Sequence, residues 1–286
     1  MNVPVRVVPT LAEYLRARRS AVHAADAGLP YGRPRRVRGL RREEVADLAC
    51  ISPEYYQRLE QDRDHHPSDQ VLVALARALG VGEAGLGYMR RLVSGVSPST
   101  VDTATAVQLV RPVLDAFSTT PAYVTNANLD IQAVNPLAAQ LSDGVFAPGR
   151  NLALDFYHDA RRRSQPRWAA LASMVAAWLR LTARDDDPRA AELCRTLLLD
   201  PHFRVVWERH DVGPMSGGTV QHHVGPLGPL PFEFTVLEIS GAPAHLLFSY
   251  HAAQGTRSAA ALAWARERAQ AQAQATVKIA GPRLSS

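Results

Sequence analysis

The stretch that decides the fold is residues 40–62, LRREEVADLACISPEYYQRLEQD. Its first half has apolar residues at the i, i+3 and i+4 spacing of one helix face, namely Val45, Leu48 and Ala49. After a break of three residues, 50–52, Ser52 stands where a helix N-cap belongs and Pro53 occupies the first helical position. A helix, a tight turn and a capped second helix predict a helix-turn-helix, whose second helix lies in the DNA major groove.

The second helix of this motif has two distinct faces. Tyr56 and Leu59 are expected to point inward, and the opposite, groove-facing side carries Pro53, Glu54, Tyr55 and Arg58. Arg58 is the best candidate for a guanine contact, because a guanidinium matches the paired O6 and N7 acceptors of that base. The alternative is that Arg58 pairs with Glu54 at i, i+4 and stays out of the groove.

The charge distribution supports a nucleic-acid partner. The chain has a net charge of +5 and a pI of about 9.5. Residues 33–42 hold six arginines with no acid between them: Arg33, Arg35, Arg36, Arg38, Arg41 and Arg42. A charge run is usually a solvated surface, but this one lies directly before the first motif helix, where phosphate contacts belong.

Bulk composition narrows the class of protein. A length of 286 residues, 47% hydrophobic and 21% charged, is that of a soluble protein with two domains. Two cysteines make a disulfide framework unexpected and fit a reducing cytosol. The N-terminus has no apolar signal region, and the longest apolar run, residues 168–179, is shorter than the roughly 20 residues of a membrane crossing. We therefore expect a cytoplasmic, nucleoid-associated protein without a membrane partner.

The N-terminal motif resembles the lambda-repressor-like, XRE-type helix-turn-helix domains over residues 40–81, ending in ALARALGV. The resemblance implies an all-α domain of five helices over residues 10–93. By the same resemblance, Arg38, Arg41 and Arg42 are expected to contact phosphate, and Arg63 to touch the backbone beyond the second helix. Groove-facing positions carried over from the family are Ser52, Pro53, Glu54, Tyr55 and Arg58. Cys50 stands where the family usually has glycine, so a left-handed turn at this position would be strained.

A second domain follows a linker at residues 94–106, which is rich in Ser, Gly and Pro near its start. Alternating patterns predict strands at 121–125, 129–135, 219–224, 232–239 and 245–251, with helices at 168–182 and 188–199 between the two groups. Strand pair, helices and three further strands predict a PAS-like α+β domain over residues 107–253, with a five-stranded antiparallel sheet and helices on one face. Residues 254–286 form an Ala- and Gln-rich tail, expected to be a frayed helix with a disordered end.

The combination of PAYV, LDIQAVNPLA, FRVVWERHDV and the strand GPLPFEFTVL resembles the MmyB-like transcription regulators, in which an XRE-type domain precedes a PAS-like ligand-binding domain. The resemblance covers about residues 10–252. It implies a small, largely apolar organic ligand, such as a fatty-acid-like molecule or a secondary metabolite. The residues that fit such a pocket are Asn135, Arg204, Trp207, His210 and Phe234. If their helix face points inward, Trp207 and His210 at i, i+3 give an aromatic wall and a polar anchor; otherwise they are ordinary core residues.

Other chemistry is disfavoured. The adjacent histidine pairs do not suit one metal ion, no Cys-x-x-Cys occurs, and no G-x-S-x-G nucleophile motif is present. We expect no metal, no cofactor and no enzyme activity. Two hypotheses remain for the second domain: a small-molecule sensor, or a ligand-free platform for dimerisation or protein interaction. A homodimer is expected in both, because one helix-turn-helix contacts too little double-stranded DNA for tight specific binding.

Overall fold

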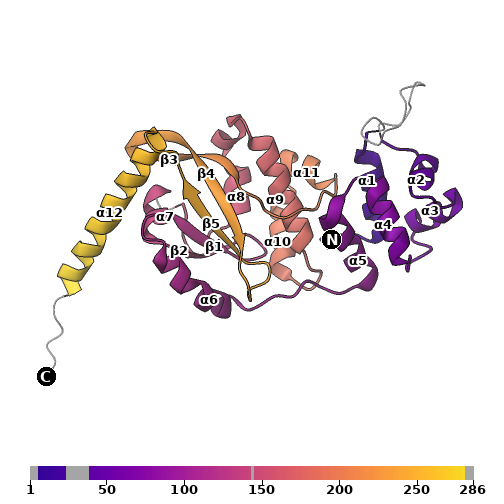
Figure 1. The fold of residues 1–286 in the computed structure, drawn as a ribbon, viewed down its shortest axis with the longest axis horizontal. Helices are drawn as coiled ribbons and strands as arrows, with labels where there is room; N and C mark the ends of the chain where they lie inside the picture. Colours follow the sequence, from indigo (N-terminus) through magenta and orange to yellow (C-terminus); the bar gives the residue numbers. More distant parts are fainter. Residues whose placement is uncertain (1–5, 24–38, 143–144, 281–286) are drawn as a thin grey trace. The chain divides into compact units, whose positions relative to one another are not determined.

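The computed structural model describes residues 6–23, 39–142 and 145–280 (Figure 1). The chain divides into two compact units, each built from two separate stretches of sequence. Unit 1 comprises Met1–Pro98 and Ala169–Met215, and unit 2 comprises Ser99–Trp168 and Ser216–Ser286. The first change of unit, after Pro98, falls inside the predicted linker at 94–106.

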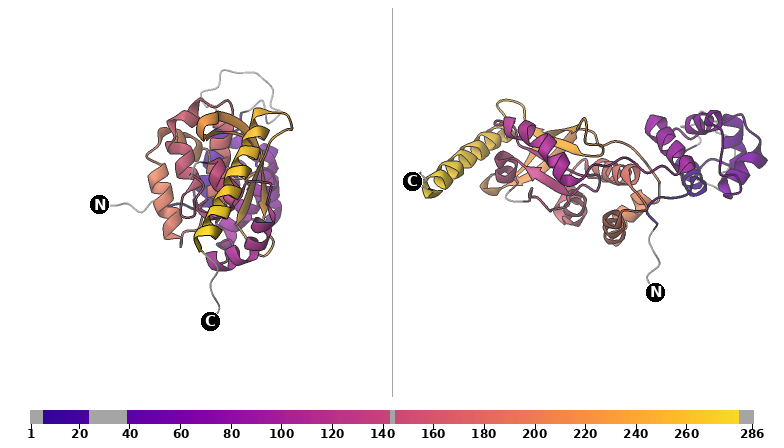
Figure 2. Two further views of the ribbon diagram at one scale, coloured as in Figure 1. Left: turned by 90° about the vertical axis from the view of Figure 1, so that its left-hand side faces the viewer. Right: turned by 90° about the horizontal axis from the view of Figure 1, so that it is seen from below.

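The described residues of the first stretch of unit 1 form five helices, as the sequence predicts. They are α1 (Leu11–Ala21), α2 (Arg42–Leu48), α3 (Pro53–Glu60), α4 (Asp69–Ala78) and α5 (Gly82–Ser94). Thr10, Ser52 and Ser68 begin three of these helices, each accepting a hydrogen bond from the backbone N–H three residues on. Figure 2 (right) shows the five helices, indigo to purple, gathered into one bundle.

The bundle is held by an aromatic and aliphatic core. All five helices contribute side chains that are at most 1% exposed, among them Tyr14, Leu15, Val45, Tyr56, Leu59, Leu75, Tyr88 and Met89. The rings of Tyr14 and Tyr88 lie 5.2 Å apart, which joins α1 to α5. Tyr56 and Leu59 are buried as predicted, so the opposite side of α3 faces outward.

The second stretch of unit 1 carries three helices: α9 (Trp168–Thr182), α10 (Pro188–Leu197) and α11 (Pro201–Trp207). The predicted helices at 168–182 and 188–199 are confirmed to within two residues. Asp187 and Asp200 cap α10 and α11 by accepting backbone N–H bonds. Leu181 and Val212 pack against the core of the bundle, which explains why this stretch belongs to unit 1.

Unit 2 contains an antiparallel sheet of five strands among its described residues, in the order β2-β1-β5-β4-β3. The strands are β1 (Ala122–Thr125), β2 (Ile131–Val134), β3 (Gly218–Val224), β4 (Gly228–Glu238) and β5 (Leu246–His251). The register places Tyr123 opposite Phe248, and Phe234 opposite Tyr250. The predicted α+β class with a five-stranded antiparallel sheet is therefore confirmed.

The two faces of this sheet differ in chemistry, because successive residues of a strand point to opposite sides. Helix α6 (Thr103–Ala116) packs through Val110 on the face that carries Val124 and Leu247. The other face is aromatic: the Tyr123 ring stacks on Phe248 at 4.9 Å, and the Tyr123 and Tyr250 hydroxyls lie 3.0 Å apart.

The remaining helices of unit 2 are α7 (Pro136–Leu141), α8 (Leu152–His158) and α12 (Arg257–Ala280), with two 3-10 turns, η1 (Ala160–Ser164) and η2 (Gly225–Leu227). Residues 257–280 form one continuous helix where the composition suggested a frayed one. Ala261 and Ala265 are fully buried at i, i+4, and α12 lies beside α7 (Figure 1). Small side chains at this spacing allow the two helices to approach closely. Residues 281–286 of the predicted disordered end lie outside the described residues.

Candidate nucleic-acid interface and ligand cavity

The helix-turn-helix has the local geometry that its sequence predicts. Ser52 Oγ accepts from the Tyr55 backbone N–H at 3.1 Å, and Pro53 is the first residue of α3. The turn is closed by a bond of 3.0 Å from the Ile51 N–H to the Ala46 carbonyl. Cys50 has a φ of 53°, so the left-handed turn is kept with a cysteine in the position that favours glycine.

The outward side of α3 is open to a partner. Ser52, Pro53, Glu54 and Arg58 are exposed, and Tyr55 is half-buried. Within the described residues Arg58 forms no ion pair with Glu54. Its guanidinium carbon instead lies 5.2 Å from the centroid of the Tyr55 ring. The structure thus places all five predicted groove-facing residues on one accessible surface.

The arginines that were predicted to contact phosphate differ in exposure and in their partners. Arg41 is exposed at the start of α2, where its backbone N–H donates to Glu44 Oε2 at 2.7 Å. Arg63 is also exposed, and its N–H donates to the Arg58 carbonyl at 3.0 Å. Arg42 is engaged by Glu60, with 44% of its side chain exposed. Arg38 lies outside the described residues.

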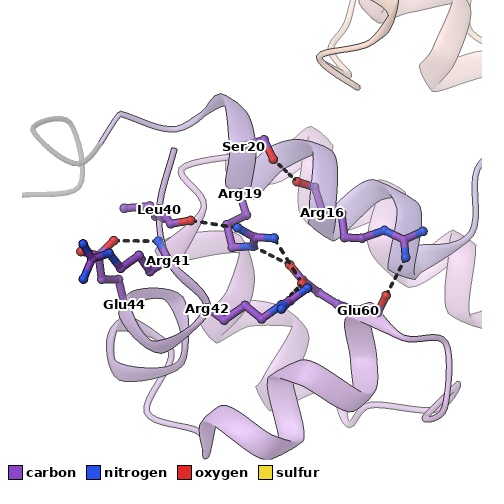
Figure 3. Close-up of polar contacts among 8 residues, drawn as sticks. All are labelled: Arg16, Arg19, Ser20, Leu40, Arg41, Arg42, Glu44 and Glu60. Atoms are coloured by element: carbon purple, nitrogen blue, oxygen red, sulfur yellow. Dashed lines mark hydrogen bonds and ion pairs between the residues drawn. The ribbon is translucent and has the colours of Figure 1, made fainter. Parts of the chain in front are cut away.

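A buried carboxylate joins helices α1, α2 and α3, as Figure 3 shows. Glu60, the last residue of α3, has a fully buried side chain. Arg19 of α1 donates from Nε to Oε1 at 2.6 Å, and Arg42 of α2 donates from Nε to Oε2 at 2.6 Å. Arg16 adds a bond of 3.0 Å from Nη1 to the Glu60 carbonyl. Glu60 therefore fixes α3 to both α1 and α2.

The electrostatics of Glu60 follow from this arrangement. Burial acts to raise the pKa of the carboxyl group, but the hydrogen bonds and charges of Arg19 and Arg42 outweigh it, so the pKa is lowered. Sequence reasoning missed Glu60 and Arg19 as functional positions. The available signal was that Glu60 lies four residues after the inward-facing Tyr56, which puts a carboxylate on the buried side of α3.

Asn135, a predicted ligand residue, has a structural role in unit 2. Its Oδ1 accepts from the N–H groups of Ala122 and Ala138 at 3.1 and 2.9 Å. Its Nδ2 donates to the carbonyls of Phe117 and Thr120 at 3.0 and 2.8 Å. All of its amide hydrogen-bonding capacity is used by the fold, where it caps α7 and joins the end of β2 to the start of β1.

Arg204, Trp207 and His210 all belong to the second stretch of unit 1. Arg204 is exposed and donates from Nη2 to the Leu198 carbonyl at 3.0 Å. Trp207 is buried under the Arg180 guanidinium, whose carbon lies 3.8 Å from its ring centroid. These contacts make Trp207 a packing residue of unit 1.

His210 does not share a helix face with Trp207. Helix α11 ends at Trp207, and His210 follows it with a φ of 53°. Burial, reinforced by the positive charges of Arg180 and Arg18, lowers the pKa of His210 to about 3. The i, i+3 argument from sequence fails here because the helix stops before the second residue is reached.

Phe234 is in unit 2, on the aromatic face of the sheet. It is 6% exposed, and its ring lies 6.3 Å from Phe248 and 6.2 Å from Tyr250. Phe234 and Asn135 are thus the two predicted ligand residues that share a unit with the sheet.

Unit 2 contains a different cavity, of about 440 Å³, lined mostly by polar side chains. Its walls come from β3 and from the chain segments that precede and follow α8 in the sequence. They include Ser142, Arg162, Gln165, His222 and His223. Gln165 is fixed to β3, since its Nε2 donates to the Gln221 carbonyl at 3.2 Å. Arg162 has only 11% of its side chain exposed and lies 3.5 Å from Asp159.

His222 is the distinctive group of this cavity. It is 5% exposed, with its ring edge-on to Phe146 at 5.1 Å and to Tyr250 at 4.9 Å. Its Nε2 is buried and makes no hydrogen bond within the described residues. Burial, reinforced by the charge of Arg162, lowers the pKa of His222 to about 3, so the ring is neutral near pH 7. No sequence pattern singled out this residue, because its neighbours are distant in the chain.

Two further observations concern the described residues alone. They bring together no group of three or more His, Cys, Asp or Glu side chains that could hold a metal ion. None of their helices has the length and apolar character that a membrane crossing requires.

Comparison with known families agrees with this arrangement. The model of the MmyB-like transcription regulator ligand binding domain matches residues 107–265, more than half of the chain, and extends into α12 beyond the expected limit at 253. A helix-turn-helix domain model matches residues 10–86. Among curated proteins, no significant match to the sequence was found. With a helix-turn-helix domain at residues 10–86 and the ligand-binding domain at residues 107–265, the chain belongs to the MmyB-like transcription regulators.

Proposed function

We propose that this transcription regulator reads an operator through the outward face of α3 and responds to a small organic ligand held in the cavity of unit 2. The observation that carries the ligand proposal is the buried Nε2 of His222 at the cavity wall. A buried polar nitrogen without a partner costs free energy, and a ligand that bonds to it recovers that cost.

The cavity walls suggest the chemistry of the ligand. A neutral imidazole can donate or accept one hydrogen bond, and the nearby Arg162 guanidinium favours an anionic or strongly accepting group. Val145 and Pro229 also line the cavity and suit an apolar body. We infer a small organic molecule with one polar or anionic end, a description that fits both a fatty-acid-like molecule and a secondary metabolite.

The alternative keeps unit 2 free of ligand and makes it a platform for dimerisation or protein interaction. The tight aromatic packing of Tyr123, Phe248 and Phe146 favours this alternative for the part of the sheet beneath them. The polar cavity beside His222 favours the sensor, because a platform has no need of a buried unpartnered nitrogen.

We propose further that the regulator acts as a homodimer on double-stranded DNA, in the compartment that holds the DNA, and that it catalyses no reaction. One bundle presents a single recognition helix, and two copies are required to cover the two half-sites of an operator. The five exposed or half-exposed residues of the α3 face support base reading.

Native mass spectrometry of the purified full-length protein, followed by denaturing extraction, tests the sensor. We expect an additional mass on the folded wild type that is released on denaturation. His222→Phe keeps a ring but removes both nitrogens, and should lack the added mass. His251→Phe, which changes an exposed histidine of the same sheet outside the cavity wall, should retain it.

The same spectra report the oligomeric state. A wild type that shows only the mass of its own chain would contradict the sensor and favour the platform. A monomer in the presence of operator DNA would contradict the homodimer.

A further inference from the structure

Tyr55 is the one aromatic side chain on the outward side of α3, and it contacts both the core of the bundle and Arg58. It is half-buried, because part of it packs against the core of the bundle. The guanidinium carbon of Arg58 lies 5.2 Å from the centroid of its ring, within the range of a cation–π contact. The two residues are three apart on the helix, a spacing that makes their side chains neighbours.

Arg58 has no competing ionic partner in the described part of the chain. Glu54, four residues earlier, forms no ion pair with it, and Arg63 contacts only its backbone carbonyl. Asp64 is close enough to Tyr55 for its charge to raise the tyrosine pKa, after the larger effect of burial. The Tyr55 ring is therefore the contact that holds the Arg58 guanidinium in place.

This contact leaves the hydrogen-bonding groups of Arg58 available. A cation–π contact uses the charge of the guanidinium, whereas its N–H donors lie in its plane and stay free for a partner. A paired guanine contact needs this plane in one orientation, and a free arginine loses rotamer entropy when it adopts that orientation. A ring already anchored in the core reduces this loss.

We propose that Tyr55 is a positioning residue that presents Arg58 to one base pair of the operator. The inference rests on the DNA-reading role proposed above. It assigns sequence preference at this base pair to a pair of side chains, in which Arg58 makes the contact and the Tyr55 ring orients it.

The test measures base preference and not affinity alone. Full-length protein selects its binding sequence from a pool of random DNA duplexes, and each variant is then titrated against this duplex and all its single-base substitutions. The variants are Arg58→Ala, Tyr55→Phe, Tyr55→Leu, Tyr55→Met and the double variant Tyr55→Leu/Arg58→Ala. Thermal unfolding of each variant is recorded, and Tyr55→Met provides a long apolar substitute if Tyr55→Leu does not fold.

We expect Arg58→Ala to lose preference at one base pair by about 5- to 100-fold. Tyr55→Leu and Tyr55→Met should lose part of the preference at the same base pair, and Tyr55→Phe should keep it. The double variant should match Arg58→Ala at this position, because the ring acts through the arginine. A merely structural role of Tyr55 would lower affinity for every duplex equally.

Three results would overturn the proposal. One is a uniform loss of affinity in Tyr55→Leu and Tyr55→Met, with base preference unchanged. A second is a loss at a different base pair from that of Arg58→Ala, which would make Tyr55 itself the reader. The third is an equal loss in Tyr55→Phe, which would assign the effect to the hydroxyl group. A wild type that selects no sequence at all would instead refute the proposed operator reading on which the inference rests.

Discussion

Arg42 donates from its Nε to Oε2 of Glu60 at 2.6 Å, and this bond ties the first residue of α2 to the last residue of α3. The same carboxylate receives Arg19 from α1. One buried side chain therefore fixes α2 relative to α3 within the helix-turn-helix. Arg42, expected from sequence to contact phosphate, has an internal role that its neighbour Arg41 lacks.

Replacing these two arginines should separate phosphate binding from stability. Arg41→Ala should reduce the slope of log affinity against log salt by about 0.9 and leave unfolding unchanged, because its exposed side chain holds no helix. Arg42→Ala should also lower the free energy of unfolding, by about 1–2 kcal/mol, since Glu60 loses a charged partner that is itself partly exposed. Salt titrations of DNA binding and urea unfolding measure the two effects. Equal unfolding free energies for both variants would contradict the internal role of Arg42.

Stability should depend on acid pH through Glu60. Its folded-state pKa is lowered from the ordinary value of 4.5, so its stabilisation is complete above about pH 4.5 and is lost as the pH falls through the folded value. Urea unfolding between pH 3 and 7 should show a steeper loss in the wild type than in Glu60→Gln. Asp69→Asn serves as the control for an exposed ion pair. The pKa of Asp69 is also lowered by an arginine, Arg90, but Asp69 is exposed whereas Glu60 is buried. Parallel curves for wild type and Glu60→Gln would exclude this dependence.

The turn of the helix-turn-helix should be improved by glycine. Cys50 has a φ of 53°, a conformation that costs a residue with a side chain about 1–2 kcal/mol and costs glycine almost nothing. Part of this gain is offset by the greater freedom of glycine in the unfolded chain. We expect Cys50→Gly to raise the free energy of unfolding by about 0.5–1 kcal/mol, and Cys50→Ala to leave it nearly unchanged. A destabilised Cys50→Gly in urea unfolding would show that the thiol contributes more than the strain costs.

Asn135 should be required for the fold of unit 2. Asn135→Ala removes the cap of α7 and leaves three backbone groups without this partner, the buried N–H of Ala122 and the partly buried carbonyls of Phe117 and Thr120, a loss of about 2–4 kcal/mol. Asn135→Asp keeps the two accepted bonds and loses the donated ones, so its loss should be intermediate. Urea unfolding followed by tyrosine fluorescence measures both. If Asn135→Ala kept full stability and lost a bound ligand, the structural role would be contradicted and a ligand-binding role of Asn135 would be supported.

The features predicted correctly from sequence are those set by local chemistry. The Ser52 cap and the burial of Tyr56 and Leu59 depend on residues within one or two helical turns. The sheet followed from period-two patterns in each strand. The cavity could not be predicted in this way, because Arg162 and His222 are distant in sequence and meet only through the fold.

Two errors have physical causes of the same kind. The expected face shared by Trp207 and His210 assumed a helix that continues, whereas the backbone turns left-handed at His210. The family resemblance implied that Asn135 lines the ligand pocket, whereas backbone groups use all of its amide hydrogen bonds. In both cases the residue type was informative, and its partners were decided by tertiary structure.

The strand order determines how late the sheet of unit 2 can be completed during synthesis on the ribosome. β5, the last strand to be synthesised, lies between β1 and β4 at the centre of the sheet. The hairpin of β1 and β2 and the hairpin of β3 and β4 are therefore synthesised first, and strand pairing joins them only when residues 246–251 of β5 follow. The helix-turn-helix, by contrast, is complete by residue 94. The helix-turn-helix domain of a nascent chain can therefore fold well before the sheet of unit 2 is complete.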